Sequence, residues 1–265
     1  MKDWREQELM NQLRIKGKLE LSEAVELLQV SESTVRRLFA RLEEEGKIIR
    51  VYGGVQLSAK HPAEYSFERV AQQHIEEKRA IAAAAVELLR DGDAIFCDSG
   101  TTVLCFCMEI VRRMREKPLK IQVFTNSLAI LEVLSPYLPV VMLGGEYRPH
   151  RKDFCGYLGE IALSRMHMNK CFLGTDGYDG KNYFTTTDFD TARLAEIAVS
   201  NSDMTVILCD SSKFKDCEPI GYASFADVDV VVTDSGLGSD VKRRLEMAQI
   251  RVGLADMEKW KRENA

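Results

Sequence analysis

The sequence of 265 residues contains no apolar run of eighteen or more residues, which argues against a membrane-spanning helix. Its first residues, MKDWREQELM, are charged and lack the hydrophobic centre of a signal peptide. The seven cysteines are odd in number, scattered, and form no C-x-x-C pair. Histidine and cysteine never fall at the spacing of metal ligands. We therefore expect a cytoplasmic protein with reduced, mostly buried cysteines and no metal site.

A surplus of positive charge is also missing. The formal net charge is −5, which argues against a globally basic nucleic-acid binder. Residues 1–60 contain eleven Lys and Arg against ten Asp and Glu, a balance of +1, and the remaining residues therefore carry −6. Any attraction for phosphate at the front of the chain must come from the placement of single basic residues.

Three short helices are predicted near the start of the chain. Apolar residues recur at helical spacing over residues 5–15, and a second helix is expected to follow with Ser22 as its N-cap. Ser31 is the expected N-cap of the third helix, which should end at Gly46. The third helix has an apolar stripe made of Val35, Leu38, Phe39 and Leu42.

A hairpin is predicted directly after these helices. The stretch KIIRVYGGVQL indicates two short strands around a Gly-Gly turn. Tightly joined helices followed by such a hairpin predict a winged helix-turn-helix.

The outer face of the third helix is suited to DNA. Arginine binds guanine edges and phosphates through a planar fork, and the first turns of such a helix can enter a major groove. The alternative is a solvated helix face whose arginines are balanced by Glu43, Glu44 and Glu45. The residues predicted to contact DNA are Ser31, Ser33, Thr34, Arg36, Arg37, Arg41, Arg50, Tyr52, Gly53 and Gly54.

This segment carries a recognisable motif. The pattern V-S-x-x-T-V-R-R, followed by L-x-x-x-G-K-I-x-R-x-x-G-G, resembles the N-terminal domain of the DeoR family of bacterial transcription regulators across roughly residues 5–57. The sequence departs from the family pattern at Leu38, where an Asp is usual, and at Tyr52, where a His is usual. Both departures bear on the operator sequence and on the details of docking.

The rest of the chain predicts an α/β fold. A polar linker over residues 58–74 precedes an Ala-rich helix that Gly92 is expected to cap. Apolar runs AIFC, IQVF, VVML, KCFLG, TVILC and DVVVT then alternate with helical patterns, which predicts a mostly parallel sheet with helices on both faces. We expect a winged helix-turn-helix domain over 1–57 and a larger α/β domain over 75–265.

Small polar residues follow five of these apolar runs. Ligands bind at the carboxyl ends of strands in such sheets. The stretch Ser-Gly-Thr-Thr at the start of a helix suits a phosphate, and Asp and Asn side chains suit sugar hydroxyls. Each loop taken alone can equally be a common turn or a helix cap. Together they predict a site for a small phosphorylated ligand.

The resemblance extends to these loops. D-S-G-T-T, T-N-S, L-G-G and D-S-S-K-F resemble the C-terminal sensor domain of the DeoR family over about residues 75–255. That domain is similar in fold to ribose-5-phosphate isomerase, glucosamine-6-phosphate deaminase and CoA transferases, and the resemblance implies a phosphorylated sugar as effector. The implied effector-binding residues are Asp98, Ser99, Gly100, Thr101, Thr102, Asn126, Ser127, Gly144, Gly145, Asp176, Asp210 and Lys213.

Two further features are expected near this site. Tyr147 and Arg148, just after Gly-Gly, either reach the ligand or belong to an ordinary surface loop. The segment between Asp179 and Ala192 is expected to lie over the pocket and to select the ligand.

The sequence therefore predicts a repressor of a carbohydrate operon, controlled by a sugar phosphate and bound to double-stranded operator DNA. We expect a homo-oligomer, either a dimer or a tetramer, in which paired winged helices read repeated half-sites, and no cofactor. One alternative is a sugar-phosphate isomerase or deaminase fused to a DNA-binding domain, although neither an activated nucleophile nor a nucleotide-binding glycine motif is present. Another is a DNA-binding architectural protein whose larger domain binds no ligand.

Overall fold

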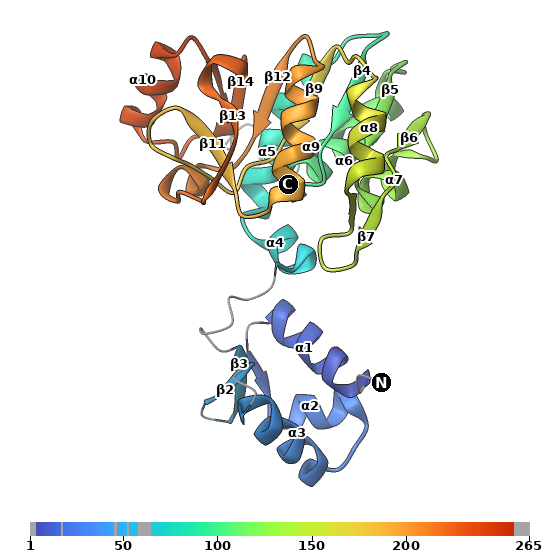
Figure 1. Ribbon diagram of the computed structural model, residues 1–265, viewed down its shortest axis with the longest axis vertical. Helices are drawn as coiled ribbons and strands as arrows, with labels where there is room; N and C mark the ends of the chain where they lie inside the picture. The colour runs from blue at the N-terminus through green and yellow to red at the C-terminus, as the bar shows by residue number, and fades with distance from the viewer. Residues whose placement is uncertain (1–3, 17, 45–46, 52, 58–64, 257–265) are drawn as a thin grey trace. The chain divides into compact units, whose positions relative to one another are not determined.

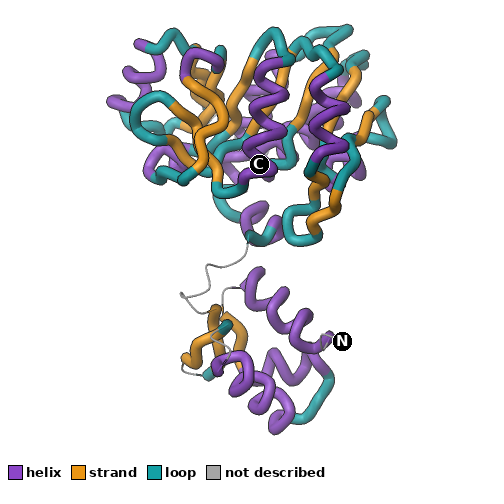
Figure 2. The backbone as a smooth tube through the Cα atoms, viewed as in Figure 1, coloured by secondary structure: helices purple, strands orange, loops and turns teal. Residues whose placement is uncertain are grey.

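The computed structural model describes residues 4–16, 18–44, 47–51, 53–57 and 65–256. The chain divides into two compact units, a smaller one that ends at Gln73 and a larger one that begins at His74 (Figure 1). Figure 2 shows helices and a small sheet in the first unit and alternating strands and helices in the second.

The smaller unit is a winged helix-turn-helix, as predicted. Its core is formed by apolar residues from its first three helices and the sheet, including Leu13, Leu28, Phe39 and Val55. The elements are α1 (Trp4–Lys16), β1 (Lys18–Glu20), α2 (Leu21–Leu28), α3 (Glu32–Glu44), β2 (Ile48–Val51) and β3 (Gly54–Leu57).

Two details of the smaller unit differ from the prediction. The wing is a three-stranded antiparallel sheet of order β1-β3-β2, because the chain between α1 and α2 adds a strand to the hairpin. Helix α2 begins two residues earlier than expected: Glu20, not Ser22, is its N-cap, and the Glu23 side chain accepts a hydrogen bond from the Glu20 backbone N–H. A capping box of two glutamates therefore replaces the expected serine cap.

The expected linker contains a helix. Residues Phe67–Gln72 form α4, and Ser66 is its N-cap. The Ala-rich helix that follows, α5 (Ile75–Ala85), is shorter than predicted, because the chain tightens into a 3₁₀ turn at Val86–Leu88 well before Gly92. Gly92 has a φ of +89° and lies in the turn that leads into the sheet.

The larger unit is built on a sheet of seven parallel strands, in the order β15-β14-β12-β9-β4-β5-β6. Six of these strands lie where the apolar runs predicted them, and the fold class is confirmed. The strands are β4 (Ala94–Cys97), β5 (Gln122–Thr125), β6 (Val140–Met142), β9 (Lys170–Leu173), β12 (Thr205–Leu208), β14 (Val230–Asp234) and β15 (Arg251–Ala255).

Helices cover both faces of the sheet. Figure 1 shows α8 (Tyr157–Ser164) and α9 (Phe189–Ser200) in front of it, with α5 and α6 (Thr101–Glu116) behind. Helix α7 (Leu128–Leu134) packs against α6, and α10 (Ser239–Met247) against β15. In the part of the chain that the structure describes, no helix is long and apolar enough to span a membrane.

Two small sheets accompany the main one, and the sequence did not predict either. The first is the hairpin of β7 (Glu146–Arg148) and β8 (Asp153–Cys155). The second has the order β10-β11-β13, with bounds Gly177–Tyr178, Tyr183–Thr186 and Ile220–Ser224. The edge strand β15 was also not predicted.

The order of the main sheet defines where a ligand can bind. From β4 the chain adds β5 and β6 on one side, and then β9, β12, β14 and β15 on the other. The direction of winding thus reverses between β4 and β9. In open α/β sheets, ligands bind at such a switch point, outside the carboxyl ends of the strands.

Candidate nucleic-acid interface and effector site

Helix α3 carries five of the ten residues predicted to contact DNA. Val35, Leu38, Phe39 and Leu42 are buried, whereas Ser33, Arg36 and Arg37 are exposed and Thr34 is half-buried. The Ser31 hydroxyl lies 3.0 Å from that of Ser33 and 2.9 Å from that of Thr34. The start of α3 therefore presents a row of hydroxyl and guanidinium groups to solvent.

The arginines of this unit have different partners. Arg36 donates from Nε and Nη2 to Glu32 Oε1, at 2.8 and 2.6 Å, on the exposed surface. Among the described residues Arg37 makes no ion pair. Arg41 instead contacts Glu6 of α1 at 3.0 Å, and Arg50 of the wing contacts Glu43 of α3 at 2.9 Å. The last two thus connect elements of the unit, while Arg36 and Arg37 extend from its surface.

The glycines of the wing have conformational roles. Gly53 has a φ of +81° in the turn. A Cβ on Gly54 would lie 2.1 Å from the Leu19 carbonyl oxygen, so only glycine allows β1 and β3 to pair here. Gly46 and Tyr52, the predicted helix cap and wing residue, lie outside the described residues.

Asp98 lies at the switch point of the larger unit. It follows β4, and its Oδ2 accepts a hydrogen bond from Gly174 N, just after β9, at 3.2 Å. Burial raises the pKa of the Asp98 carboxyl to about 6, against the lowering effect of hydrogen bonds from Ser99 and Gly174 N–H. Gly100 is the N-cap of α6, and Thr101 and Thr102 form the buried first turn of that helix. The D-S-G-T-T stretch is therefore located at the switch point, at the carboxyl end of β4.

A buried ion-pair network lies beside this loop. The Ser99 hydroxyl donates to Asp153 Oδ2 at 3.1 Å. Asp153 is fully buried and accepts two bonds from the Arg148 guanidinium, at 2.9 and 2.7 Å. Arg148 also donates to Asp188, the N-cap of α9, at 2.7 Å. Arg148, whose side chain is 12% exposed, thus connects Asp153 to the start of α9, whereas Tyr147 is exposed and packs on Phe154.

The next two strand ends provide fewer accessible groups. Ser127 is fully buried, and its hydroxyl caps α7. Asn126 donates from Nδ2 to Phe154 O at 3.0 Å, while its buried Oδ1 has no hydrogen-bond donor among the described residues. Gly144 is exposed. Gly145 lies so close to Cys155 that a Cβ on it would be 2.1 Å from the Cys155 carbonyl oxygen. Of these four residues, Asn126 has the free polar atom.

The remaining strand ends carry two aspartates and a lysine. Asp176 Oδ2 accepts bonds from the Thr186 hydroxyl at 2.8 Å and from Thr187 N at 3.2 Å, so the segment between Asp179 and Ala192 is fastened to the site through Asp176. Asp210 is buried and caps the 3₁₀ turn Ser211–Lys215, and Lys213 of that turn is half-buried.

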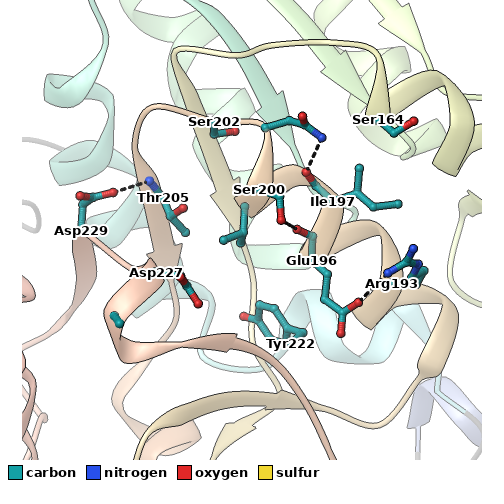
Figure 3. Close-up of a pocket in the computed structure, with 13 residues that line it drawn as sticks. Ser164, Arg193, Glu196, Ile197, Ser200, Ser202, Thr205, Tyr222, Asp227 and Asp229 are labelled. Atoms are coloured by element: carbon teal, nitrogen blue, oxygen red, sulfur yellow. Dashed lines mark hydrogen bonds and ion pairs between the residues drawn. The ribbon is translucent and has the colours of Figure 1, made fainter.

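A polar cleft occurs at the opposite edge of the sheet. Figure 3 shows it between α9, Thr205 and Asp229, and the Asp229 carboxylate accepts a hydrogen bond from Thr205 N at 2.7 Å. Thr205 begins β12 and Asp229 directly precedes β14. The cleft is thus at the amino ends of the strands, and none of the predicted effector residues lines it.

The cysteines and acidic residues do not form a metal site in the described part of the chain: it holds no group of three or more His, Cys, Asp and Glu side chains suited to an ion. All seven cysteines are free, and six of them are buried.

Comparison with known proteins identifies both units. The model of the DeoR-like helix-turn-helix domain matches residues 5–61, and that of the DeoR C terminal sensor domain matches residues 73–235. The chain belongs to the DeoR family. The resemblance seen in the sequence motifs is thereby confirmed, and the two compact units correspond to the DNA-binding and sensor parts of a DeoR-family transcriptional regulator.

Several DeoR-family relatives are similar over nearly their whole length. The uncharacterized HTH-type transcriptional regulator YulB of Bacillus subtilis (strain 168) is 30% identical over 96% of this chain and 97% of its own. The lactose phosphotransferase system repressor of Staphylococcus epidermidis (strain ATCC 12228 / FDA PCI 1200) is 34% identical over 83% of this chain and 87% of its own. Ribose 5-phosphate isomerase A from Methanocaldococcus jannaschii matches about half of each chain, 52% of this one and 53% of its own, with a TM-score of 0.40 and 22% identity.

Proposed function

We propose that this protein represses a carbohydrate operon and is controlled by a phosphorylated sugar. The smaller unit binds double-stranded operator DNA through the first turns of α3, and the larger unit binds the effector at the carboxyl edge of its sheet. The name of the Staphylococcus relative, a lactose phosphotransferase system repressor, supports a carbohydrate-linked role.

The main support for an effector site is the convergence of two loops at the switch point. The loop after β4 contributes Asp98, Ser99 and the first turn of α6, and Gly174 after β9 donates a hydrogen bond to Asp98. Backbone N–H groups at the start of α6 suit a phosphate. In this proposal the phosphate binds residues 99–102 and Lys213.

A second observation supports sugar hydroxyls as the other half of the ligand. A buried acceptor without a donor costs free energy, and Asn126 Oδ1 is such an atom among the described residues. A ligand hydroxyl supplies the missing donor. In this proposal Asp98 and Asp176 accept bonds from further hydroxyls, since carboxylates only accept when ionised.

Regulation requires that the effector bind two states of the protein unequally. In this proposal larger units associate into a dimer or tetramer in the cytoplasm, so that paired helices α3 read repeated half-sites. The effector favours one conformation of the larger unit and thereby changes how readily the linked smaller units bind operator DNA.

The test is a thermal-shift screen against sugar phosphates, with the matching unphosphorylated sugars as controls. The expected result is a rise of several degrees with a phosphorylated compound and none with its sugar. Operator DNA is then selected from a random-sequence pool with the purified protein. The same compound must change the affinity for the selected DNA. A protein that binds DNA but shifts with no sugar phosphate would contradict the effector assignment.

One observation favours a second candidate, a sugar-phosphate isomerase. A general base works best when its pKa lies near the working pH, and that of the buried Asp98 carboxyl is raised to about 6. Aldose–ketose interconversion of the sugar phosphate that stabilises the protein distinguishes the two functions. Turnover that is lost in Asp98→Asn would identify an enzyme, whereas binding without turnover is expected of a regulator.

A further inference from the structure

The most exposed large apolar side chains of the described residues are concentrated in one place. Phe189, Tyr157 and Leu158 are 77%, 74% and 71% exposed, and of the four most exposed only Met247 lies elsewhere, in α10. Tyr157 and Leu158 begin α8, and Phe189 begins α9. Single apolar residues on a surface are ordinary, whereas a group of them indicates a surface that another molecule covers.

An ion pair between the two helices shows that these side chains lie together. Helices α8 and α9 lie side by side in front of the sheet (Figure 1), and Glu160 of α8 contacts Arg193 of α9 at 3.5 Å. Tyr157 precedes Glu160 by three residues and is therefore on the same side of α8. Phe189 precedes Arg193 by four residues and is on the same side of α9. The two helices run in the same direction, because each leads into a strand of the parallel sheet. Tyr157 and Phe189 thus extend from neighbouring first turns, and we call Tyr157, Leu158 and Phe189 the apolar patch.

The chain on either side of Phe189 is held in place by polar contacts. Arg148 donates to the Asp188 carboxylate at 2.7 Å, and the Cys155 thiol lies 3.6 Å from the Asp190 carboxylate. The start of α9 is therefore anchored to the β7–β8 hairpin. A side chain on an anchored backbone loses less conformational entropy when a partner covers it, so Phe189 is suited to be a fixed contact point.

The charged residues around the apolar patch indicate which partner covers it. Asp190 and Arg193 are exposed on α9, and Glu160 lies beside them on α8. Carboxylates at this place disfavour a nucleic acid or an anionic membrane surface, because like charges repel. A rim with charges of both signs is complementary to a rotated copy of itself, since a two-fold axis can bring each carboxylate opposite a guanidinium of the other copy.

We propose that the apolar patch of α8 and α9 is the two-fold interface between the larger units of two copies of this chain. The assignment rests on the proposed function, which requires paired DNA-binding units. An aromatic side chain buries about 150–250 Å², so the patch supplies roughly half of the about 800 Å² that each partner contributes to a standard interface. The charged rim supplies the remainder. Aromatic side chains are also enriched in the buried centres of such interfaces.

The test measures the association of the full chain by sedimentation equilibrium over a range of protein concentrations. Leu158→Glu and Phe189→Glu each place a charge in the patch, and both positions lie in a first helical turn, where a carboxylate suits the helix dipole. Each variant is expected to raise the dissociation constant at least tenfold. Met247→Glu is the matched control, because Met247 is 78% exposed but lies in α10, and it should associate like wild type.

Hydroxyl-radical labelling of the wild type gives a second readout that does not depend on the folding of any variant. The labelling of Tyr157 and Phe189 should fall as the protein concentration rises, while that of Met247 stays constant. A wild type that remains monomeric would overturn the proposal, as would association that neither patch variant weakens or that Met247→Glu weakens equally. Low labelling of the patch at every concentration would also overturn it, because another segment of the same chain would then cover the patch.

The interface and the effector site can fail separately. The rise in melting temperature with a sugar phosphate is expected to persist in Leu158→Glu, because Leu158 belongs to none of the proposed effector loops. A wild type that associates through the patch but responds to no sugar phosphate refutes the effector assignment and keeps the interface. A wild type that responds to a sugar phosphate, but whose association neither patch variant weakens, refutes the interface alone.

Discussion

The hydroxyl of Ser99 donates a 3.1 Å hydrogen bond to the carboxylate of Asp153, 54 residues further along the chain. Ser99 belongs to the loop after β4, and Asp153 belongs to the β7–β8 hairpin. Arg148 holds Asp153 in its guanidinium fork and reaches Asp188 at the start of α9. A ligand bound at Ser99 therefore contacts a network that extends to a helix on the opposite face of the sheet.

Arg148→Met is expected to destabilise the larger unit. The substitution leaves the Asp153 carboxylate, which is fully buried, without its main counter-charge. Breaking a buried ion pair from one side costs about 3–5 kcal/mol. Scanning calorimetry on the full chain measures the loss as a lower melting temperature of the larger unit.

Two further variants control this result. Arg193→Met removes the surface ion pairs of Arg193 with Glu196 on α9 and Glu160 on α8, and is expected to cost less than about 1 kcal/mol. The double variant Arg148→Met, Asp153→Leu replaces the whole pair with apolar side chains and is expected to recover part of the loss. A double variant no more stable than Arg148→Met would show that the carboxylate is not the cause.

Asp98→Asn is expected to stabilise the protein at neutral pH. The pKa of Asp98 is raised from 3.8 to about 6 in the folded state, so the folded protein holds a proton that the unfolded chain has already released. Ionisation of Asp98 above pH 6 therefore opposes folding by about 3 kcal/mol at most. The amide removes this cost and still accepts the hydrogen bond from Gly174 N.

The pH dependence identifies the cause. The free energy of unfolding of Asp98→Asn should exceed that of wild type by the full amount at pH 7.5. The difference should shrink as the pH falls through 6 and vanish below 3.8, the pKa of Asp98 in the unfolded chain. Unfolding curves for wild type and variant at pH 7.5, 6 and 5 give this profile. A gain that is equal at all three pH values would indicate packing instead of ionisation.

The sequence predicted the positions of the candidate site better than its contacts. Parallel strands end at one edge, so the apolar runs were enough to place Asp98, Asp176 and Asp210 together. Contacts between segments that are far apart in the chain produce no periodic pattern in the sequence. No sequence pattern indicated that Arg148 pairs with Asp153, or that Ser127 is a buried helix cap. Strands of three residues, such as β7 and β8, are too short to show alternation.

Lys78 shows the same limit in another form. It lies in the charged stretch EEKRA, which is typical of an exposed first helical turn. Its burial depends on how α5 packs against α6 and the sheet, and helical spacing alone does not show which face a charged turn buries.

Gly54→Ala is expected to disrupt the wing. A Cβ at this position would lie 2.1 Å from the Leu19 carbonyl oxygen and 2.8 Å from Glu20 Cα, and both are backbone atoms of the paired strand β1. The strands must separate, at a cost of more than about 2 kcal/mol. Faster amide hydrogen exchange in residues 18–20 measures the separation.

Gly53→Ala is the matched control for the wing. Gly53 has a φ of +81°, but no atom lies within 4 Å of the added Cβ. The substitution should cost only about 1 kcal/mol and leave the pairing of β1 with β3 intact. Equal amide hydrogen exchange of residues 18–20 in Gly53→Ala and Gly54→Ala would show that the close approach of β1 to Gly54 is not the cause.

Arg36→Ala and Arg37→Ala are both expected to weaken operator binding. Arg37 has no ion pair among the described residues, and the exposed pair between Arg36 and Glu32 is worth less than about 1 kcal/mol, so DNA can displace it. An arginine that contacts a guanine edge contributes roughly 1–3 kcal/mol, which corresponds to a tenfold or greater loss of affinity. Fluorescence anisotropy on selected operator DNA gives the affinities.

The salt dependence of binding distinguishes the two kinds of contact. If Arg37 binds a phosphate, Arg37→Ala lowers the slope of log K against log salt by about one and weakens all sequences alike; if it reads a base, the slope is kept and specificity is relaxed at one position. Arg243→Ala, on the exposed surface of α10, is the control and should change neither the slope nor the specificity.

The rise in melting temperature with effector should be unchanged in all these variants, because α3 belongs to the smaller unit. Loss of that shift in Arg37→Ala would contradict the assignment of DNA binding and effector binding to separate units.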